Sequence, residues 1–91
     1  MRIIYKDSFV HRLENQLEHI AKDNPGAAGK FKRDLMARIK DIPRNPLKYR
    51  KSIYFDNKTI RDLIFKTYTV VFRINKNSIE VFGFVGYQEK P

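Results

Sequence analysis

The sequence predicts an α+β fold, in which a helical hairpin packs on one face of a small, mostly antiparallel sheet. Between residues 9 and 42 the apolar residues form two stripes at helical spacing, separated by an Asn-Pro break. A short apolar strand precedes these helices, and β-rich segments follow them from Ile53 onward. Helices and strands that are segregated along the chain, rather than alternating, favour this class.

Length and composition restrict the possibilities further. The 91 residues predict a single domain, 1–91, and the chain has no cysteine for disulfides or thiolate-bound metal. No stretch approaches the ~20 apolar residues of a membrane span, and MRIIYKDSF lacks the apolar core of a signal peptide. We therefore expect a soluble cytoplasmic protein that uses no cofactor.

The charge is strongly biased, with 19 Lys and Arg against 10 Asp and Glu, a net charge of +9. Such a domain attracts polyanions or acidic proteins. The alternative is a soluble surface with a cationic bias and no specific partner.

The helical half begins after a predicted strand at Arg2–Tyr5, where Asp7 or Ser8 provides an N-cap. The first apolar stripe contains Phe9, Leu13, Leu17 and Ile20. Asn24 and Pro25 then end this helix and begin another, because Asn caps well and Pro fits the first helical turn. The second stripe contains Ala28, Phe31, Leu35, Ile39 and Ile42 and stops near Pro43. So short a break predicts antiparallel helices.

The second half of the chain is predicted to be mainly β. A basic loop, RNPLKYRK, follows Pro43, and then come IYF, the turn formers DNK, TIRDLIF, TYTVVFRI and SIEVFGFVG. Asn75-Lys76-Asn77 is typical of a hairpin turn. The predicted order is strand, helix, helix, then three or four strands.

Alternation along the last two strands assigns residues to faces of the sheet. In TYTVVFRI, Tyr68, Val70, Phe72 and Ile74 share one face. In the last strand Ile79, Val81 and Val85 share a face, and Glu80, Phe82 and Phe84 point away. The face without helices then carries Val71, Phe82 and Phe84, an apolar patch that suits a partner. The alternative is that a bulge or the Pro43–Lys51 loop covers them.

Three stretches of the chain, taken together, resemble the RelE/ParE superfamily, the toxins of bacterial type II toxin–antitoxin modules. DNPGAAGKF is similar to the family's NP-x-A-A-x-x-F connection between helices. TIRDLIFKTYTVVFRI is similar to the family's vReL…Yrivyri pattern, and the closing SIEVFGFVGYQEKP matches a strand that ends in proline. The resemblance implies a β-α-α-β-β-β(-β) fold.

The superfamily divides by mechanism, and the residues at three positions distinguish its branches. RelE-like members are implied to be ribosome-dependent ribonucleases that cleave mRNA, and ParE-like members are implied to inhibit DNA gyrase by binding. Where the ribonuclease pattern has an arginine, a histidine and an arginine, this chain has Thr69, Gly86 and Gln88. Neither threonine nor glycine can neutralise a phosphate or shuttle a proton in their place. Tyr87 remains a possible catalytic acid or base, with cations from Lys51, Lys58, Arg61 or Arg73.

Other candidate residues have both a functional and a structural interpretation. Arg61 either grips a carboxylate of a target or antitoxin, or pairs with an acid of its own sheet. Tyr49, within the basic loop, suits stacking and pairing with cations. His11 and His19 lie off the apolar stripe and are expected to be solvated, and they make a poor metal site.

The sequence thus predicts a ParE-like toxin that acts on DNA gyrase by binding and is neutralised by an antitoxin with an acidic segment. The predicted contact residues are Arg61, Arg73, Lys51, Lys58, Tyr49, Val71, Phe82 and Phe84. One alternative is a RelE-like ribonuclease with a site around Tyr87, and another is a non-toxic basic binding module.

Overall fold

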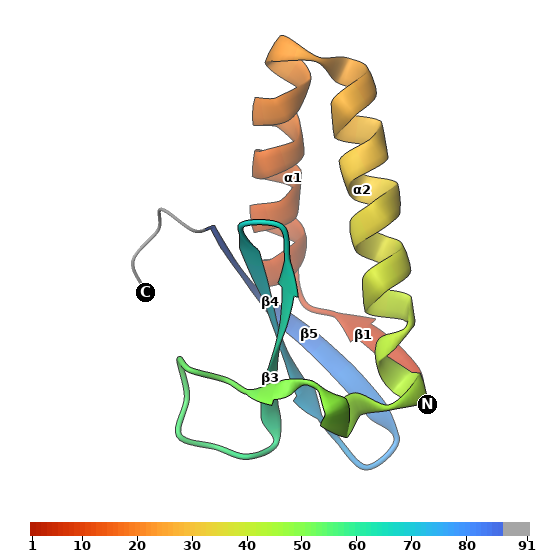
Figure 1. Cartoon of the computed structure of the whole chain (residues 1–91), viewed down its shortest axis with the longest axis vertical. Helices are drawn as coiled ribbons and strands as arrows, with labels where there is room; N and C mark the ends of the chain where they lie inside the picture. The colour runs from red at the N-terminus through yellow and green to blue at the C-terminus, as the bar shows by residue number, and fades with distance from the viewer. Residues whose placement is uncertain (87–91) are drawn as a thin grey trace.

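A layer of two helices lies against a sheet in the computed structural model, which describes residues 1–86 (Figure 1). The helices are α1 (Asp7–Asp23) and α2 (Pro25–Lys40), and they form an antiparallel hairpin whose connecting turn extends beyond the sheet. The α+β class predicted from the sequence is confirmed. None of the helices in this described part of the chain is long and apolar enough to cross a membrane.

The break between the helices follows from two adjacent residues. The Asn24 side chain accepts a hydrogen bond from the Ala27 amide at 3.1 Å, and Pro25 occupies the first turn of α2. Both predicted roles are confirmed. At the start of α1 no side chain caps the helix, and Asp7 lies within the first turn.

The sheet contains five strands within the described residues, in the spatial order β1-β5-β4-β3-β2. Their bounds are β1 (Arg2–Tyr5), β2 (Arg50–Lys51), β3 (Ile60–Phe65), β4 (Tyr68–Ile74) and β5 (Ser78–Gly86). β1 runs parallel to β5, and the other pairs are antiparallel. The last described strand along the chain therefore lies inside the sheet.

The main core fills the space between the helices and the face of the sheet that they cover. The predicted stripes supply its helical side: Phe9, Leu13, Phe31, Leu35, Ile39 and Ile42 are buried there. The Phe31 ring meets the rings of Phe65 and Tyr68 edge to face, each at 5.3 Å between centroids. These contacts tie α2 to the β3–β4 hairpin.

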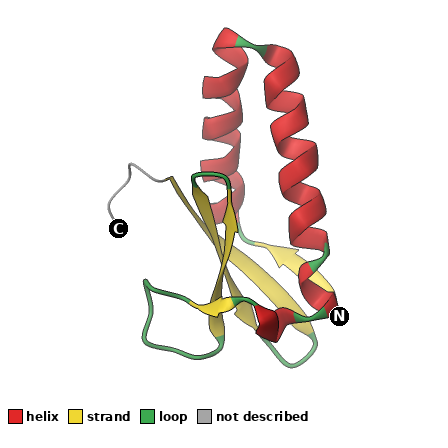
Figure 2. Ribbon diagram, viewed as in Figure 1, coloured by secondary structure: helices red, strands yellow, loops and turns green. Residues whose placement is uncertain are grey.

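The chain between α2 and β3 differs from the prediction. It forms two short 3₁₀ turns, η1 (Ile42–Arg44) and η2 (Pro46–Lys48), followed by the two residues of β2. The expected strand at Ile53–Phe55 is wrong, because these residues belong to an irregular segment, Ser52–Thr59, drawn as loop in Figure 2. The backbone amide of Ile53 bonds to the Asp62 carboxylate at 3.1 Å instead of to a strand.

The β4–β5 pairing is interrupted by a bulge that changes which residues face the core. Val71 pairs with Gly83, but Phe72 pairs with Val81, so Phe82 is an extra residue. Phe84 consequently points into the main core, where its ring stacks on Tyr68 at 5.0 Å. The predicted placement of Phe84 on the other face is wrong for this reason. The predicted hairpin turn at Asn75-Lys76-Asn77 is confirmed, with Asn75 N donating to Ser78 O at 2.9 Å.

Candidate partner-binding groove

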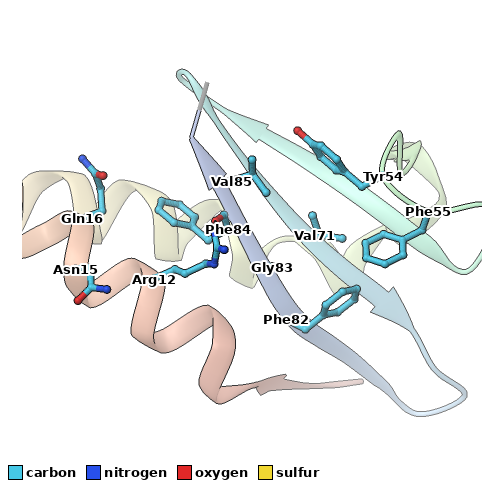
Figure 3. A pocket seen from close by; sticks show the side chains of 10 residues that line it. All are labelled: Arg12, Asn15, Gln16, Tyr54, Phe55, Val71, Phe82, Gly83, Phe84 and Val85. Carbon is cyan, nitrogen blue, oxygen red and sulfur yellow. Dashed lines mark hydrogen bonds between the residues drawn. The ribbon is translucent and has the colours of Figure 1, made fainter. Parts of the chain in front are cut away.

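A groove of about 940 Å³ crosses β5 and reaches from α1 to the face of the sheet opposite the helices (Figure 3). We call that face the second face. The groove is lined by Arg12, Asn15, Gln16, Tyr54, Phe55, Val71, Phe82, Gly83, Phe84 and Val85. Its α1 wall is polar, and its floor and opposite wall are apolar or aromatic.

The groove exists because β5 is longer than its neighbour β1. The pairing of the two ends at Tyr5 and Val81, so β1 does not extend along Phe82–Gly86. Side chains of α1 occupy this edge instead. Ser8 Oγ donates to the Phe82 carbonyl at 2.7 Å, and Arg12 Nη1 donates to the Phe84 carbonyl at 3.3 Å. Side chains thus cover part of an edge that would otherwise pair with another strand.

The floor and far wall depend on a glycine and two aromatic residues. A β-carbon on Gly83 would lie 2.9 Å from the Val71 Cβ, so only glycine allows this approach of β5 to β4. Across the floor, Phe55 meets Phe82 edge to face at 5.6 Å between ring centroids. Tyr54 lines the same wall.

The predicted apolar contact residues Val71, Phe82 and Phe84 all line this groove. They do not form the open patch that strand alternation predicts, since Val71 is 2% exposed and Phe84 is 4% exposed. The alternative of a covered face describes the structure better. Both a bulge and a loop reduce the exposure of the predicted patch. The loop is Ser52–Thr59 and not Pro43–Lys51.

The predicted cationic residues do not converge on one site. Arg61 Nε donates to the Lys58 carbonyl at 2.9 Å, and Arg61 Nη1 donates to the Tyr49 carbonyl at 3.0 Å, so this guanidinium joins two loops. Lys51 is its cross-strand partner and is exposed. Arg73 faces Glu80 across β4 and β5, on the second face. Their roles in binding a target or antitoxin stay predictions.

Tyr49 has the mixed surroundings that the sequence indicates. Its ring meets Phe72 edge to face at 5.5 Å, and the Lys48 ammonium lies 5.3 Å from its centroid. Lys48 and Arg44 are also within 3.6 Å of the Asp41 carboxylate. Part of the positive charge of this loop is therefore balanced locally.

The positions that separate the two branches are only partly described. Thr69 is buried opposite Val85, and Gly86 is the last described residue of β5. Tyr87 and Gln88 lie outside the described residues. His11 and His19 are exposed, as predicted, and within residues 1–86 no three His, Asp or Glu side chains are grouped to hold a metal.

Sequence reasoning missed the residues that shape the groove. Gly83 interrupts an apolar strand, a pattern that often marks a bulge. Asp62 interrupts the apolar run of TIRDLIF, and it is buried and ion-paired with Arg50 at 3.2 Å. Arg12 gives no comparable indication, because one exposed arginine on a helix is ordinary.

Comparisons with known proteins agree with this fold. The family model described as "ParE toxin of type II toxin-antitoxin system, parDE" matches residues 3–90. A solved structure described as "Chromosomal ParDE TA system from P. aeruginosa" shares the fold with a TM-score of 0.78 at 14% identity, over 97% of each chain. A search of curated protein sequences finds no significant match. The family model spans nearly the whole chain, and the chain therefore belongs to the ParE toxin family of type II toxin–antitoxin systems.

Proposed function

We propose that this chain inhibits bacterial growth in the cytoplasm by binding DNA gyrase, and that a cognate antitoxin neutralises it through an acidic segment. The observation that carries this proposal is the ParE family match over residues 3–90. The net charge of +9 supports an acidic partner, because complementary charge speeds encounter and disfavours wrong partners.

The groove is the surface best suited to the antitoxin segment. Its floor and far wall offer apolar contact at Val71, Phe55 and Phe82, and its α1 wall carries the Arg12 guanidinium. An amphipathic segment placed there would bury its apolar side chains against the sheet and direct a carboxylate towards α1. Antitoxin segments that order on binding suit a long groove of this kind.

Binding, rather than RNA cleavage, is favoured by the residues at the branch-specific positions. Thr69 and Gly86 carry no cation and no imidazole where the ribonuclease pattern has them. Thr69 is also only 9% exposed, so it is poorly placed to reach a substrate.

The target is tested by adding the purified chain to two reactions. One measures supercoiling by purified gyrase, and the other measures the integrity of mRNA in a purified translation system. We expect supercoiling to fall while the mRNA stays intact. Cleaved mRNA with normal supercoiling would overturn the proposal in favour of the ribonuclease alternative. No effect in either reaction would favour a non-toxic binding module.

The groove is tested with two variants that each add one negative charge. Gln16→Glu places the charge on the α1 wall of the groove, and Ala37→Glu places it on α2, which contributes no lining residue. The probe is the purified cognate antitoxin. Gln16→Glu should weaken its binding several-fold and Ala37→Glu should not. If Gln16→Glu and Ala37→Glu bind the antitoxin with the same affinity, the antitoxin binds outside the groove.

A further inference from the structure

The second face of the sheet buries apolar residues although no helix of the described chain lies over it. Ile60 and Val71 are each 2% exposed on this face. The segment Ser52–Thr59, the green loop between β2 and β3 in Figure 1, lies on this side of the sheet. Its residues Tyr54 and Phe55 line the groove together with Val71, and Phe55 contacts Phe82. A single irregular segment thus replaces the second helical layer that covers many sheets.

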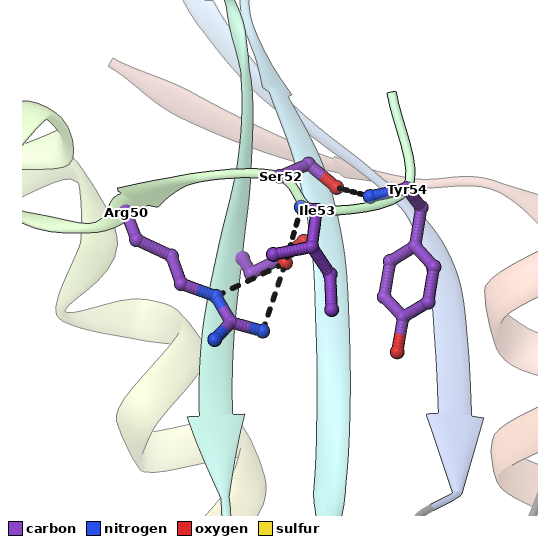
Figure 4. A network of polar contacts seen from close by, with 5 residues as sticks. Arg50, Ser52, Ile53 and Tyr54 are labelled. Atoms are coloured by element: carbon purple, nitrogen blue, oxygen red, sulfur yellow. Dashed lines mark hydrogen bonds and ion pairs between the residues drawn. The ribbon is translucent and has the colours of Figure 1, made fainter. Parts of the chain in front are cut away.

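The segment is fixed firmly at its two ends. At the first end, Ser52 N donates to the Ile60 carbonyl at 2.9 Å. Ile53 N donates to Asp62 Oδ2 at 3.1 Å, a bond drawn as a dashed line from Ile53 in Figure 4. Arg50 Nε donates to the same carboxylate oxygen at 3.2 Å.

At the second end, the Asn57 side chain accepts hydrogen bonds from the Thr59 amide at 2.9 Å and the Thr59 hydroxyl at 2.7 Å. The Thr59 carbonyl accepts from Ile74 N at 2.8 Å, which joins this end to β4.

The middle of the segment, Tyr54–Asp56, is held much more weakly. Within residues 1–86 no hydrogen bond joins these three residues to the sheet, and the Tyr54 amide bonds only to Ser52 Oγ, at 3.2 Å. The ring of Phe55 contacts Phe82, yet Phe55 remains 45% exposed. Among the described residues, apolar contact alone keeps this part against the sheet.

The Asp62 carboxylate, which binds the first end of the segment, uses only one of its two oxygens within the described chain. Oδ2 accepts from Arg50 and Ile53, but the buried Oδ1 has no hydrogen-bond partner among the described residues. A buried acceptor without a partner raises the free energy of the closed arrangement, and exposure to water relieves that cost. Among the described residues, the Asp62 carboxylate therefore holds the segment through one oxygen only.

We propose that Tyr54–Asp56 is a lid over the second face, that the Arg50–Asp62 pair holds its first end closed, and that its opening widens the groove and exposes Val71 and Phe82 further. Tyr54 and Phe55 already form the far wall of the groove, so movement of the lid changes the width of the groove directly. The main core does not include the residues under the lid, and opening leaves that core intact. The lid is a property of the free chain and needs no target or antitoxin.

Hydrogen exchange measured by mass spectrometry tests the lid in two variants. Phe55→Ala removes the ring contact, and Arg50→Gln removes the cation from the buried carboxylate. Both altered side chains are at least partly exposed, so the main core is unchanged. Loss of one aromatic pair should speed exchange within residues 52–59 by about two- to tenfold, and α1 and β4 should exchange at the wild-type rate.

Leu47→Ala is the matched control, because Leu47 is an exposed apolar residue of η2 outside the lid. This variant should leave exchange in residues 52–59 unchanged. The lid is overturned if, in the wild type and both variants, residues 52–59 exchange only as slowly as β3 and β4.

Hydroxyl-radical footprinting tests what the lid covers. In Arg50→Gln, oxidation of Phe82 should increase relative to the wild type, and oxidation of Phe84 should not, because Phe84 belongs to the main core. Equal oxidation of Phe82 in the two proteins contradicts the proposal. A parallel increase at both rings also contradicts it, since the whole sheet would then be opening.

Discussion

Gly83 lies so close to the side chain of Val71 that a β-carbon at position 83 would be 2.9 Å from the Val71 Cβ. Gly83→Ala therefore forces β5 away from β4 at the bulge. We expect it to lower the free energy of unfolding by about 1–3 kcal/mol, measured by urea denaturation.

Gly29→Ala in α2 is the matched control for this prediction. There the added carbon would meet Arg33 Nη1 at 3.5 Å, an ordinary contact. Because alanine is the better helix former, this variant should be more stable than the wild type by about 0.5–1 kcal/mol. If Gly83→Ala and Gly29→Ala change the free energy of unfolding by similar amounts, the closeness of residue 83 to Val71 is not what requires glycine there.

Arg61 is predicted to be a structural residue, because its guanidinium bonds to the carbonyls of Lys58 and Tyr49. Arg61→Lys keeps the charge but cannot make both bonds in the same geometry. It should lower the free energy of unfolding by about 1–2 kcal/mol in thermal or urea denaturation. Lys51→Gln, at the exposed cross-strand partner, should change it by less than about 0.5 kcal/mol. Unchanged stability in Arg61→Lys, together with weaker antitoxin binding, would support the binding interpretation instead.

The turn between β3 and β4 contains a strained residue. Lys66 has φ of 54°, and it is the single non-glycine residue with positive φ among residues 1–86. Lys66→Gly should raise the midpoint of thermal unfolding, because a side chain in this region costs about 1–2 kcal/mol. Thr67→Gly should lower the midpoint, since it adds freedom to the unfolded chain without relieving strain. A lower midpoint for both variants would argue against strain at Lys66.

The exposed pair on α2 predicts a defined pH dependence. Lys30 Nζ donates to Asp34 Oδ2 at 2.9 Å, and this bond lowers the pKa of Asp34 below its usual value. A carboxylate with a lowered folded-state pKa stabilises the fold above its unfolded-state pKa, and the contribution is lost as the pH falls through the folded-state pKa. The difference in unfolding midpoint between the wild type and Asp34→Asn should therefore narrow as the pH falls below about 4. A difference that is constant from pH 7 to the acid limit would exclude this mechanism.

The helical half of the fold was predictable because its determinants are local. Asn24 and Pro25 mark a boundary by their own chemistry, and the stripe from Ala28 to Ile42 has a single helical period. The turn at Asn75 is equally local. Such features depend on neighbours within a few residues, which the sequence displays directly.

The faces of β5 were not predictable by counting alternate residues. One extra residue at Phe82 reverses the alternation, so Phe84 enters the core. The irregular path of Ile53–Phe55 depends on Asp62, a residue about nine positions away whose burial no local pattern displays. Likewise the groove depends on β1 ending at Tyr5 beside β5, a relationship between opposite parts of the chain. The periodicity of apolar residues does not predict long-range pairing of this kind.

The position of β5 inside the sheet also determines when the sheet can fold during synthesis of the chain. Arg2 pairs with Ser78, so β1 has no partner strand until residue 78 has been made. Until then the chain contains the residues of both helices but lacks the strand that joins β1 to β4. Contacts so distant in sequence delay folding until late. A chain that stops before residue 78 therefore cannot complete this sheet, because β1 and β4 are joined through β5.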